Sequence, residues 1–153
     1  MSFIIAEIGN LISTCEDVES KLSNLPRWRP KAKYMIAEAT ASCIAKLLNG
    51  YVKGIYLIDL SGGEFMADFS GRDIDLVVDI KGDLVGFEND LKQALEYALN
   101  GLLSRVAASY ISEVGKRDIV EIHVVSDYRS GYGRLIKSKY SPAIRLWPPP
   151  EPW

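Results

Sequence analysis

The first 25 residues carry an apolar stripe with helical spacing. Its positions are separated alternately by four and three residues: Ile4, Ile8, Leu11, Cys15, Val18, Leu22 and Leu25. This spacing predicts a helix over about residues 2–24. A second helix is expected from about Pro30 to Asn49, with Gly50 as its stop. The two segments predict an N-terminal helical pair over residues 2–49.

The hydrophobic period then changes to that of strands. Residues 52–60 are apolar at both parities, which predicts a central strand buried on both faces. Apolar and polar residues alternate over 73–80 and over 118–125. This pattern predicts two strands, each with one polar face. A turn-rich loop is expected over 61–71 and a long helix over about 86–114, ended by Gly115.

The order helix, helix, strand, strand, helix, strand predicts a small α+β or α/β protein. A length of 153 residues suggests a single domain. We divide it into the helical pair (2–49), a core (52–126), and a basic and proline-rich C-terminal segment (127–153). The tail from Trp147 to Trp153 is expected to be polyproline II, packed on the body or on a partner subunit, or disordered.

The amino-acid composition narrows the class of protein to which the chain can belong. With 48% hydrophobic and 25% charged residues, the chain reads as an ordinary globular protein, with no apolar run long enough to cross a bilayer. The N-terminus lacks the basic start of a secretory signal, so a cytoplasmic location is expected. Two cysteines and one histidine exclude a four-ligand Cys/His zinc site. Cys15 and Cys43 are expected to be buried, reduced thiols.

Charge is unevenly distributed. Residues 59–90 hold nine acids against two bases, whereas residues 129–145 hold five bases and no acid. The acidic middle of the chain could bind cations and its basic end could bind phosphates. Alternatively, both sets of charges could simply be solvated surface. The basic and aromatic stretch after residue 127 could stack a base, but the net charge of −2 argues against nucleic-acid binding as the main role.

The most informative feature is a set of acidic residues on the polar faces of the expected strands. Asp73 and Asp75 lie on one face, about 6.6 Å apart along the strand. Two such carboxylates repel each other unless a cation bridges them, and they suit Mg²⁺. Glu121 adds a third carboxylate from another strand. Upstream, the backbone of Ser61-Gly62-Gly63 could cradle a phosphate.

These features together resemble the nucleotidyltransferase superfamily with the DNA-polymerase-beta-like fold. Its signature is a glycine-rich turn followed by a hydrophobic-flanked Asp-x-Asp and a later acid on another strand, here Gly62-Gly63, Asp73-Ile74-Asp75-Leu76 and Glu121. The resemblance covers about residues 52–126. It implies an α+β fold with a small mixed β-sheet packed on helices, preceded here by the helical pair.

The resemblance also implies an activity, namely transfer of a nucleotidyl group from an NTP to an acceptor hydroxyl. Asp73, Asp75 and Glu121 would be catalytic and would bind Mg²⁺ or Mn²⁺, and Ser61, Gly62 and Gly63 would bind the nucleotide. The acceptor is open: nucleic acid, a small molecule or a protein side chain. The alternative is an inactive nucleotide-binding or protein-interaction module on the same fold, with oligomerisation through the first helix or the Pro/Trp tail.

Other polar residues receive structural interpretations. Asp79 is expected at the surface and Asp59 as a turn cap. His123 shares the face of Glu121 and is expected to be a partly buried structural histidine. If the strand register differs, Asp118 or Asp127 could replace Glu121.

Overall fold

The computed structural model describes residues 2–58, 73–127, 131–137 and 143–149. Its elements in chain order are α1 (Ser2–Leu11), η1 (Ile12–Thr14), α2 (Asp17–Lys21), α3 (Arg29–Leu47), β1 (Val52–Ile58), β2 (Ile74–Ile80), η2 (Gly82–Leu84), α4 (Glu88–Val106), α5 (Ala108–Val114), β3 (Val120–Val125), α6 (Gly131–Lys137) and β4 (Ile144–Trp147). The fold is α+β, as expected.

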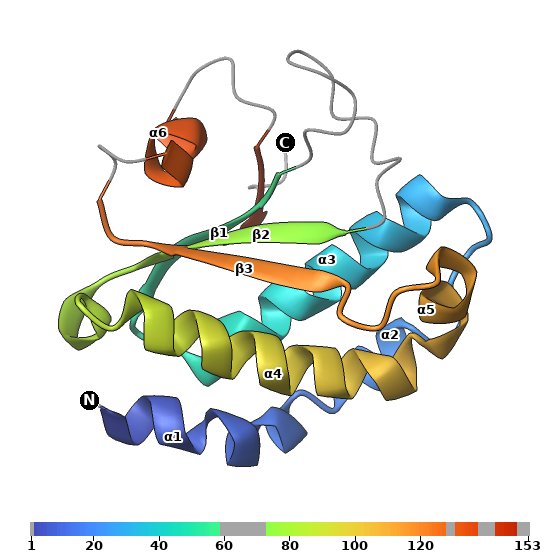
Figure 1. Ribbon diagram of the computed structural model, residues 1–153, viewed down its shortest axis with the longest axis horizontal. Coiled ribbons are helices and arrows are strands. Elements are labelled where there is room, and N and C mark those ends of the chain that lie inside the picture. The colour runs from blue at the N-terminus through green and yellow to red at the C-terminus, as the bar shows by residue number, and fades with distance from the viewer. Residues whose placement is uncertain (1, 59–72, 128–130, 138–142, 150–153) are drawn as a thin grey trace.

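The four strands form one mixed sheet in the order β3-β2-β1-β4. β2 and β3 are parallel, while β1 is antiparallel to both β2 and β4. A helical layer of α3 and α4 covers one face, and α1 lies on the outer side of α4 (Figure 1). On the other side of the sheet lies α6. The sheet therefore has one apolar, helix-covered face and one face available for polar groups.

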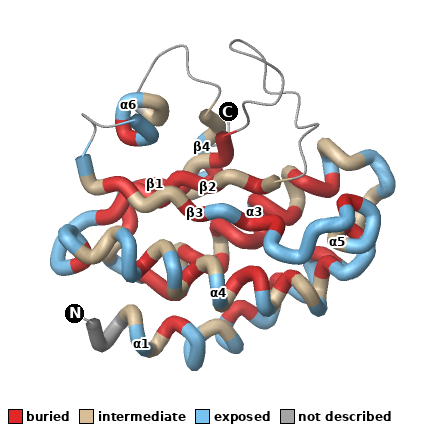
Figure 2. The backbone as a smooth tube through the Cα atoms, in the orientation of Figure 1, coloured by how far each residue is buried: buried red, intermediate tan, exposed pale blue. Residues whose placement is uncertain are grey.

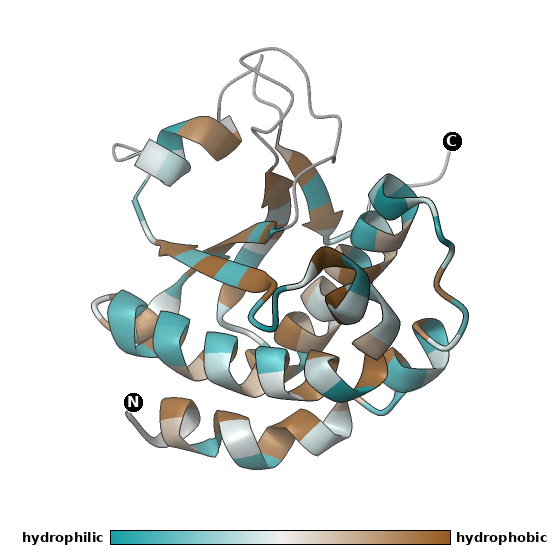
Figure 3. Cartoon of the chain, turned by 45° about the vertical axis from the view of Figure 1, so that its right-hand side comes forward, coloured by the Kyte–Doolittle hydropathy of each residue, from teal (hydrophilic) through white to brown (hydrophobic). Residues whose placement is uncertain are grey.

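The core lies between the sheet and the helical layer, where buried residues gather (Figure 2). α4 turns four leucines at i, i+4 spacing toward the strands: Leu91, Leu95, Leu99 and Leu103. β3 alternates apolar and polar residues from Val120 to Val124, and hydrophobic and hydrophilic colours alternate along the strands in Figure 3. Every second residue of a strand and every third or fourth residue of a helix lies on one face. The apolar faces of the strands and of α4 therefore meet in one continuous apolar layer.

The outer edge of β3 is bonded to side chains of α4. The Asn100 side-chain amide donates to the Val120 carbonyl and accepts from the Val120 N–H, both at 3.0 Å. Glu96 accepts from the Ile122 N–H at 2.7 Å, and the Lys92 ammonium donates to the Ile122 carbonyl at 2.8 Å. These groups take the place of a neighbouring strand and fix the position of β3 on α4.

Several predicted elements are confirmed. α3, β1, β2 and β3 match the predictions within a few residues, and Gly115 ends α5 with φ 70°. The loop expected over 61–71 lies outside the described residues. The long helix expected over 86–114 is broken: it runs through Gly101 and turns at Ala107, which lets Tyr110 and Val114 of α5 point into the core.

The prediction of one helix over 2–24 is wrong. The chain forms α1, η1 and α2, and the hydroxyls of Ser13 and Thr14 donate to the carbonyls of Asn10 and Leu11. Such local hydrogen bonds compete with helix continuation. α1 packs against α4 while α2 packs against α3, so the segment does not form the simple helical pair that was expected.

Cys15 and Cys43 form a disulfide, so the expectation of reduced thiols is wrong. The break after α1 places Cys15 opposite α3, with a Cα–Cα distance of 5.3 Å between the two cysteines. Both residues are buried, as expected. Disulfides persist mainly in oxidising compartments, apart from those in hyperthermophile proteins. The cytoplasmic location accordingly stays a prediction.

The C-terminal segment holds two elements that the sequence pattern did not predict, α6 and β4. β4 pairs with β1 and carries Trp147, which precedes a cis peptide bond to Pro148. Residues 150–153 of the expected polyproline stretch lie outside the described residues. Within the described part of the chain, no helix is both long and apolar enough to cross a membrane.

Candidate metal centre on the open face of the sheet

Polar side chains gather on the sheet face opposite α3 and α4. In the parallel pairing of β2 and β3, Asp75 is opposite Glu121 and Val77 is opposite His123. Partners in register point to the same face, so alternate residues of both strands share it. The intervening residues, among them Leu76 and Ile122, are buried toward the helices. The alternation that buries the apolar residues of β2 and β3 therefore also places their polar residues together on the opposite face.

Three of these side chains form a compact group, the carboxylate–histidine cluster of Asp75, Glu121 and His123. One ligand atom from each lies within 4.8 Å of the others. His123 Nε2 is 3.3 Å from Asp75 Oδ1. Glu121 is exposed, whereas the His123 side chain is only 11% exposed. The cluster could hold a metal ion, with two carboxylates and one imidazole as donors.

Helix α6 packs over this part of the sheet. Leu135 and Ile136 contact a small apolar group of Ile58, Val77 and Val125. This contact brings the Tyr132 ring onto the His123 ring, with centroids 3.9 Å apart and planes 20° from parallel. Burial raises the pKa of the Tyr132 phenol, the charges of Asp75 and Glu121 raise it further, and Lys92 lowers it. The histidine is thus held between a carboxylate and an aromatic ring.

Asp73 is not part of the cluster. It lies just before β2, and its carboxylate accepts a hydrogen bond from the Lys116 ammonium. Lys116 follows the left-handed Gly115 that ends α5. The structure therefore brings together two of the three expected carboxylates and pairs the third with a lysine.

Asp79 is buried, with 2% exposure, so its expected surface position is wrong. It lies opposite Gly54 of β1. Burial of Tyr56 raises the pKa of its phenol, and the charge of Asp79 raises it further. Arg145 of β4, the register partner of Tyr56, lowers that pKa. The expectation failed because distance along a strand says nothing about what covers its far end.

The remaining candidates can be placed briefly. Asp118 and Asp127 are exposed at the two ends of β3, and Glu121 is the residue opposite Asp75. Ser61, Gly62, Gly63 and Asp59 lie outside the described residues. His123 is partly buried, as expected, but belongs to the cluster. The signal for this was that His123 and Glu121 lie on the same face of the expected strand. The sequence allowed the basic and aromatic stretch that contains Tyr132 to stack a base, and nothing in it indicated contact with His123.

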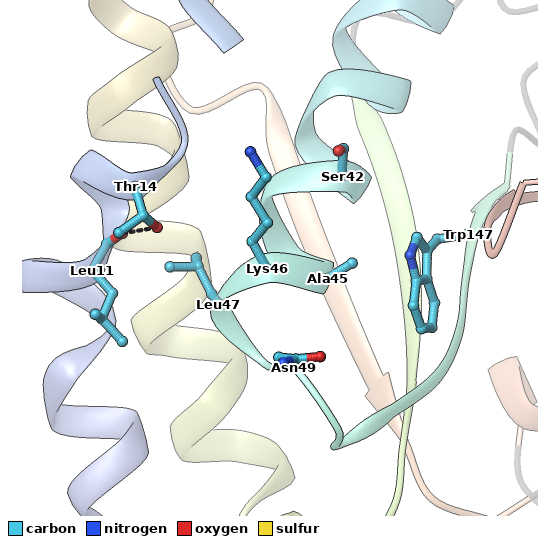
Figure 4. Close-up of a pocket in the computed structure, with 8 residues that line it drawn as sticks. All are labelled: Leu11, Thr14, Ser42, Ala45, Lys46, Leu47, Asn49 and Trp147. Carbon is cyan, nitrogen blue, oxygen red and sulfur yellow. Dashed lines mark hydrogen bonds between the residues drawn. The ribbon is translucent and has the colours of Figure 1, made fainter. Parts of the chain in front are cut away.

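Two surface pockets differ in chemistry. One, of about 590 Å³, lies between η1, α3 and β4, with Lys46 and Trp147 in its lining (Figure 4). The Lys46 ammonium already forms an ion pair with the Asp17 carboxylate, at 3.1 Å. The other, of about 570 Å³, is lined by α4, Lys116, Asp118 and Glu121, so it borders the cluster.

No family model, curated protein or solved structure matches the chain.

Proposed function

We propose that the protein is a metal-dependent nucleotidyltransferase, which transfers a nucleotidyl group from an NTP to an acceptor hydroxyl. The observation that carries the proposal is the pairing of Asp75 with Glu121 on neighbouring parallel strands, with His123 beside them. The elements around them follow the order β1, β2, α4, β3, with the acids on the second and third strands. This order supports the resemblance stated from the sequence.

The donors of the cluster fit a divalent cation. Asp75 and Glu121 provide hard oxygen ligands, which suit Mg²⁺ and Mn²⁺, and His123 provides a nitrogen, which suits Mn²⁺ better than Mg²⁺. A bound dication would supply positive charge to neutralise the phosphate oxygens of the NTP. Without it, the two carboxylates would repel a triphosphate.

The chain's own residues would bind and orient the substrate. Asp75 and His123 contact each other, and Tyr132 covers the imidazole, so the ring orientation is fixed before any ligand arrives. Preorganised groups cost little reorganisation during a reaction. Ser61, Gly62 and Gly63 would contact the phosphates, as the resemblance implies.

A second candidate is an inactive nucleotide-binding or protein-interaction module on the same fold. The pairing of Asp73 with Lys116 favours it, because a centre of two metal ions would need that carboxylate free. In an active protein, nucleotide or metal would have to draw Asp73 away from the lysine.

The test is calorimetric titration of each NTP with and without Mg²⁺ or Mn²⁺. The variants are Asp75→Asn and Glu121→Gln, with Asp83→Asn as matched control, an exposed aspartate in η2. We expect metal-dependent binding in the wild type and in the control, and its loss in both cluster variants.

Radiolabelled NTP then separates the two candidates. Transfer of label to any acceptor, with release of pyrophosphate, supports the transferase. Binding without transfer to nucleic acid, small alcohols or protein would favour the inactive module. Absence of metal-dependent binding to every NTP, in a folded wild-type protein, would refute both nucleotide proposals.

A further inference from the structure

Tyr132 of α6 carries a hydroxyl and lies against the cluster through the contact of its ring with His123. Tyr132 is 39% exposed, and its ring lies flat on His123. Its position depends on the contacts that Leu135 and Ile136 make with the sheet. Burial and, after it, the charges of Asp75 and Glu121 raise the pKa of the Tyr132 phenol.

The aromatic stack is more than a cover for the imidazole. Phenylalanine at this position would give the same ring contact without a hydroxyl. The tyrosine instead adds a nucleophile-type oxygen to a partly exposed side chain that stacks on His123, one of the residues that would bind the metal. A phenol can form a covalent intermediate or product with a phosphorus centre when it is so placed.

We propose that Tyr132 is a site of self-nucleotidylylation, the acceptor hydroxyl being on the protein's own α6. This inference rests on the proposed function. The Tyr132 Oη attacks the α-phosphorus of the NTP, and an Oη–Pα bond forms. The bond from Pα to the bridging oxygen of the β-phosphate breaks, and pyrophosphate leaves with that electron pair. The phenolic proton passes to solvent water, since Asp75 and Glu121 would be bound to the metal.

Other tyrosines provide a comparison. Tyr97 is 87% exposed on α4, on the opposite side of the sheet from α6. If exposure alone governed modification, Tyr97 would react first. Tyr110 is buried in the helical layer. Proximity to the cluster therefore distinguishes Tyr132 from Tyr97 and Tyr110, and this difference makes the proposal specific.

The experiment incubates the purified full chain with Mn²⁺ or Mg²⁺ and each NTP, and follows intact mass and tryptic peptides by mass spectrometry. We expect one added nucleoside monophosphate, less water, on the peptide containing Tyr132. Tyr132→Phe should lose the adduct while keeping metal-dependent NTP binding by calorimetry. The matched control Tyr97→Phe should keep both. Asp75→Asn should lose both.

The outcomes separate this inference from the proposed function. NTP binding without an adduct, or an adduct that persists in Tyr132→Phe, would overturn self-modification and leave the nucleotide site standing. Loss of NTP binding in the wild type would overturn the proposed function itself. An adduct rate independent of protein concentration supports reaction within one chain, and a rate that rises with concentration would contradict it.

Discussion

Asp75 of β2 and Glu121 of β3 lie directly opposite each other on parallel strands, pointing away from the helical layer. Two carboxylates in such positions repel each other in a metal-free protein. The fold tolerates this pair because the partner strands are fixed by the core beneath them. Sites of this kind commonly sacrifice stability for function.

A divalent cation should therefore stabilise the wild type. At a metal concentration of about 100 Kd, the gain in unfolding free energy is about 2.7 kcal/mol. Asp75→Asn should remove this gain while leaving the metal-free stability unchanged or higher. Thermal denaturation with and without Mn²⁺ checks this. An equal metal effect in Asp75→Asn would show that the ion binds elsewhere.

His123 should make the site prefer Mn²⁺ to Mg²⁺, because an imidazole nitrogen is a better ligand for the transition metal. His123→Gln should weaken Mn²⁺ binding by at least about tenfold, the loss typical even of residues that only support a ligand. Mg²⁺ binding should change less. Competition titrations followed by electron paramagnetic resonance of free Mn²⁺ measure both. Equal losses for the two ions would argue against direct nitrogen ligation.

The Cys15–Cys43 disulfide closes a loop with a sequence separation of 28 residues. Chain-entropy arguments give about 3–4 kcal/mol for a loop of this length. The Cys15→Ala/Cys43→Ala double variant should lose about that much unfolding free energy in urea. A reductant should lower the stability of the wild type and leave the double variant unaffected. Identical denaturation curves with and without reductant in the wild type would contradict the bond.

Asn100 satisfies both backbone groups of Val120 from a buried position. Asn100→Ala should cost about 2–3 kcal/mol, since two buried backbone groups lose their partners. Asn89→Ala, an exposed asparagine at the start of the same helix, is the matched control and should change stability by less than about 0.5 kcal/mol. Chemical denaturation of the two variants compares them.

Glu88 links the start of α4 to the end of β3. Its carboxylate accepts hydrogen bonds from the Ser126 hydroxyl at 2.7 Å and the Gly86 N–H at 3.0 Å. The Ser126 bond and, to a smaller degree, the Gly86 bond lower the pKa of Glu88, against burial. Because the folded pKa lies below the unfolded one, the stabilisation is present above the unfolded pKa and is lost as pH falls through the folded pKa.

Glu88→Gln should therefore be less stable than the wild type by about 1 kcal/mol at neutral pH, and the difference should vanish in acid. Denaturant titrations at a series of pH values between neutral and strongly acidic supply the comparison. A difference that stays constant with pH would mean that the charge of Glu88 has no part in the contact.

The sequence predicted β2 and β3 well because the alternation of apolar and polar residues in each reflects one physical choice, core or solvent, whereas β4 was not predicted. Alternation alone places Asp75 and Glu121 on the polar faces of their strands. The register that sets them opposite each other depends on how β3 packs against α4. Pairing of Asp73 with Lys116 joins segments that are distant in the chain and left no periodic trace. The helix break at Ala107 likewise left no trace in the pattern, since the apolar stripe continues through it.

The bonds from α4 to the outer edge of β3 have a consequence beyond this single chain. An uncovered edge strand is a template on which another polypeptide can add a strand, and it leads to fibrils or swapped assemblies. Here Lys92, Glu96 and Asn100 already occupy the donor and acceptor positions of Val120 and Ile122 that such a strand would need. While α4 is folded, a strand of another molecule therefore cannot pair with Val120 and Ile122 unless it first displaces these side chains.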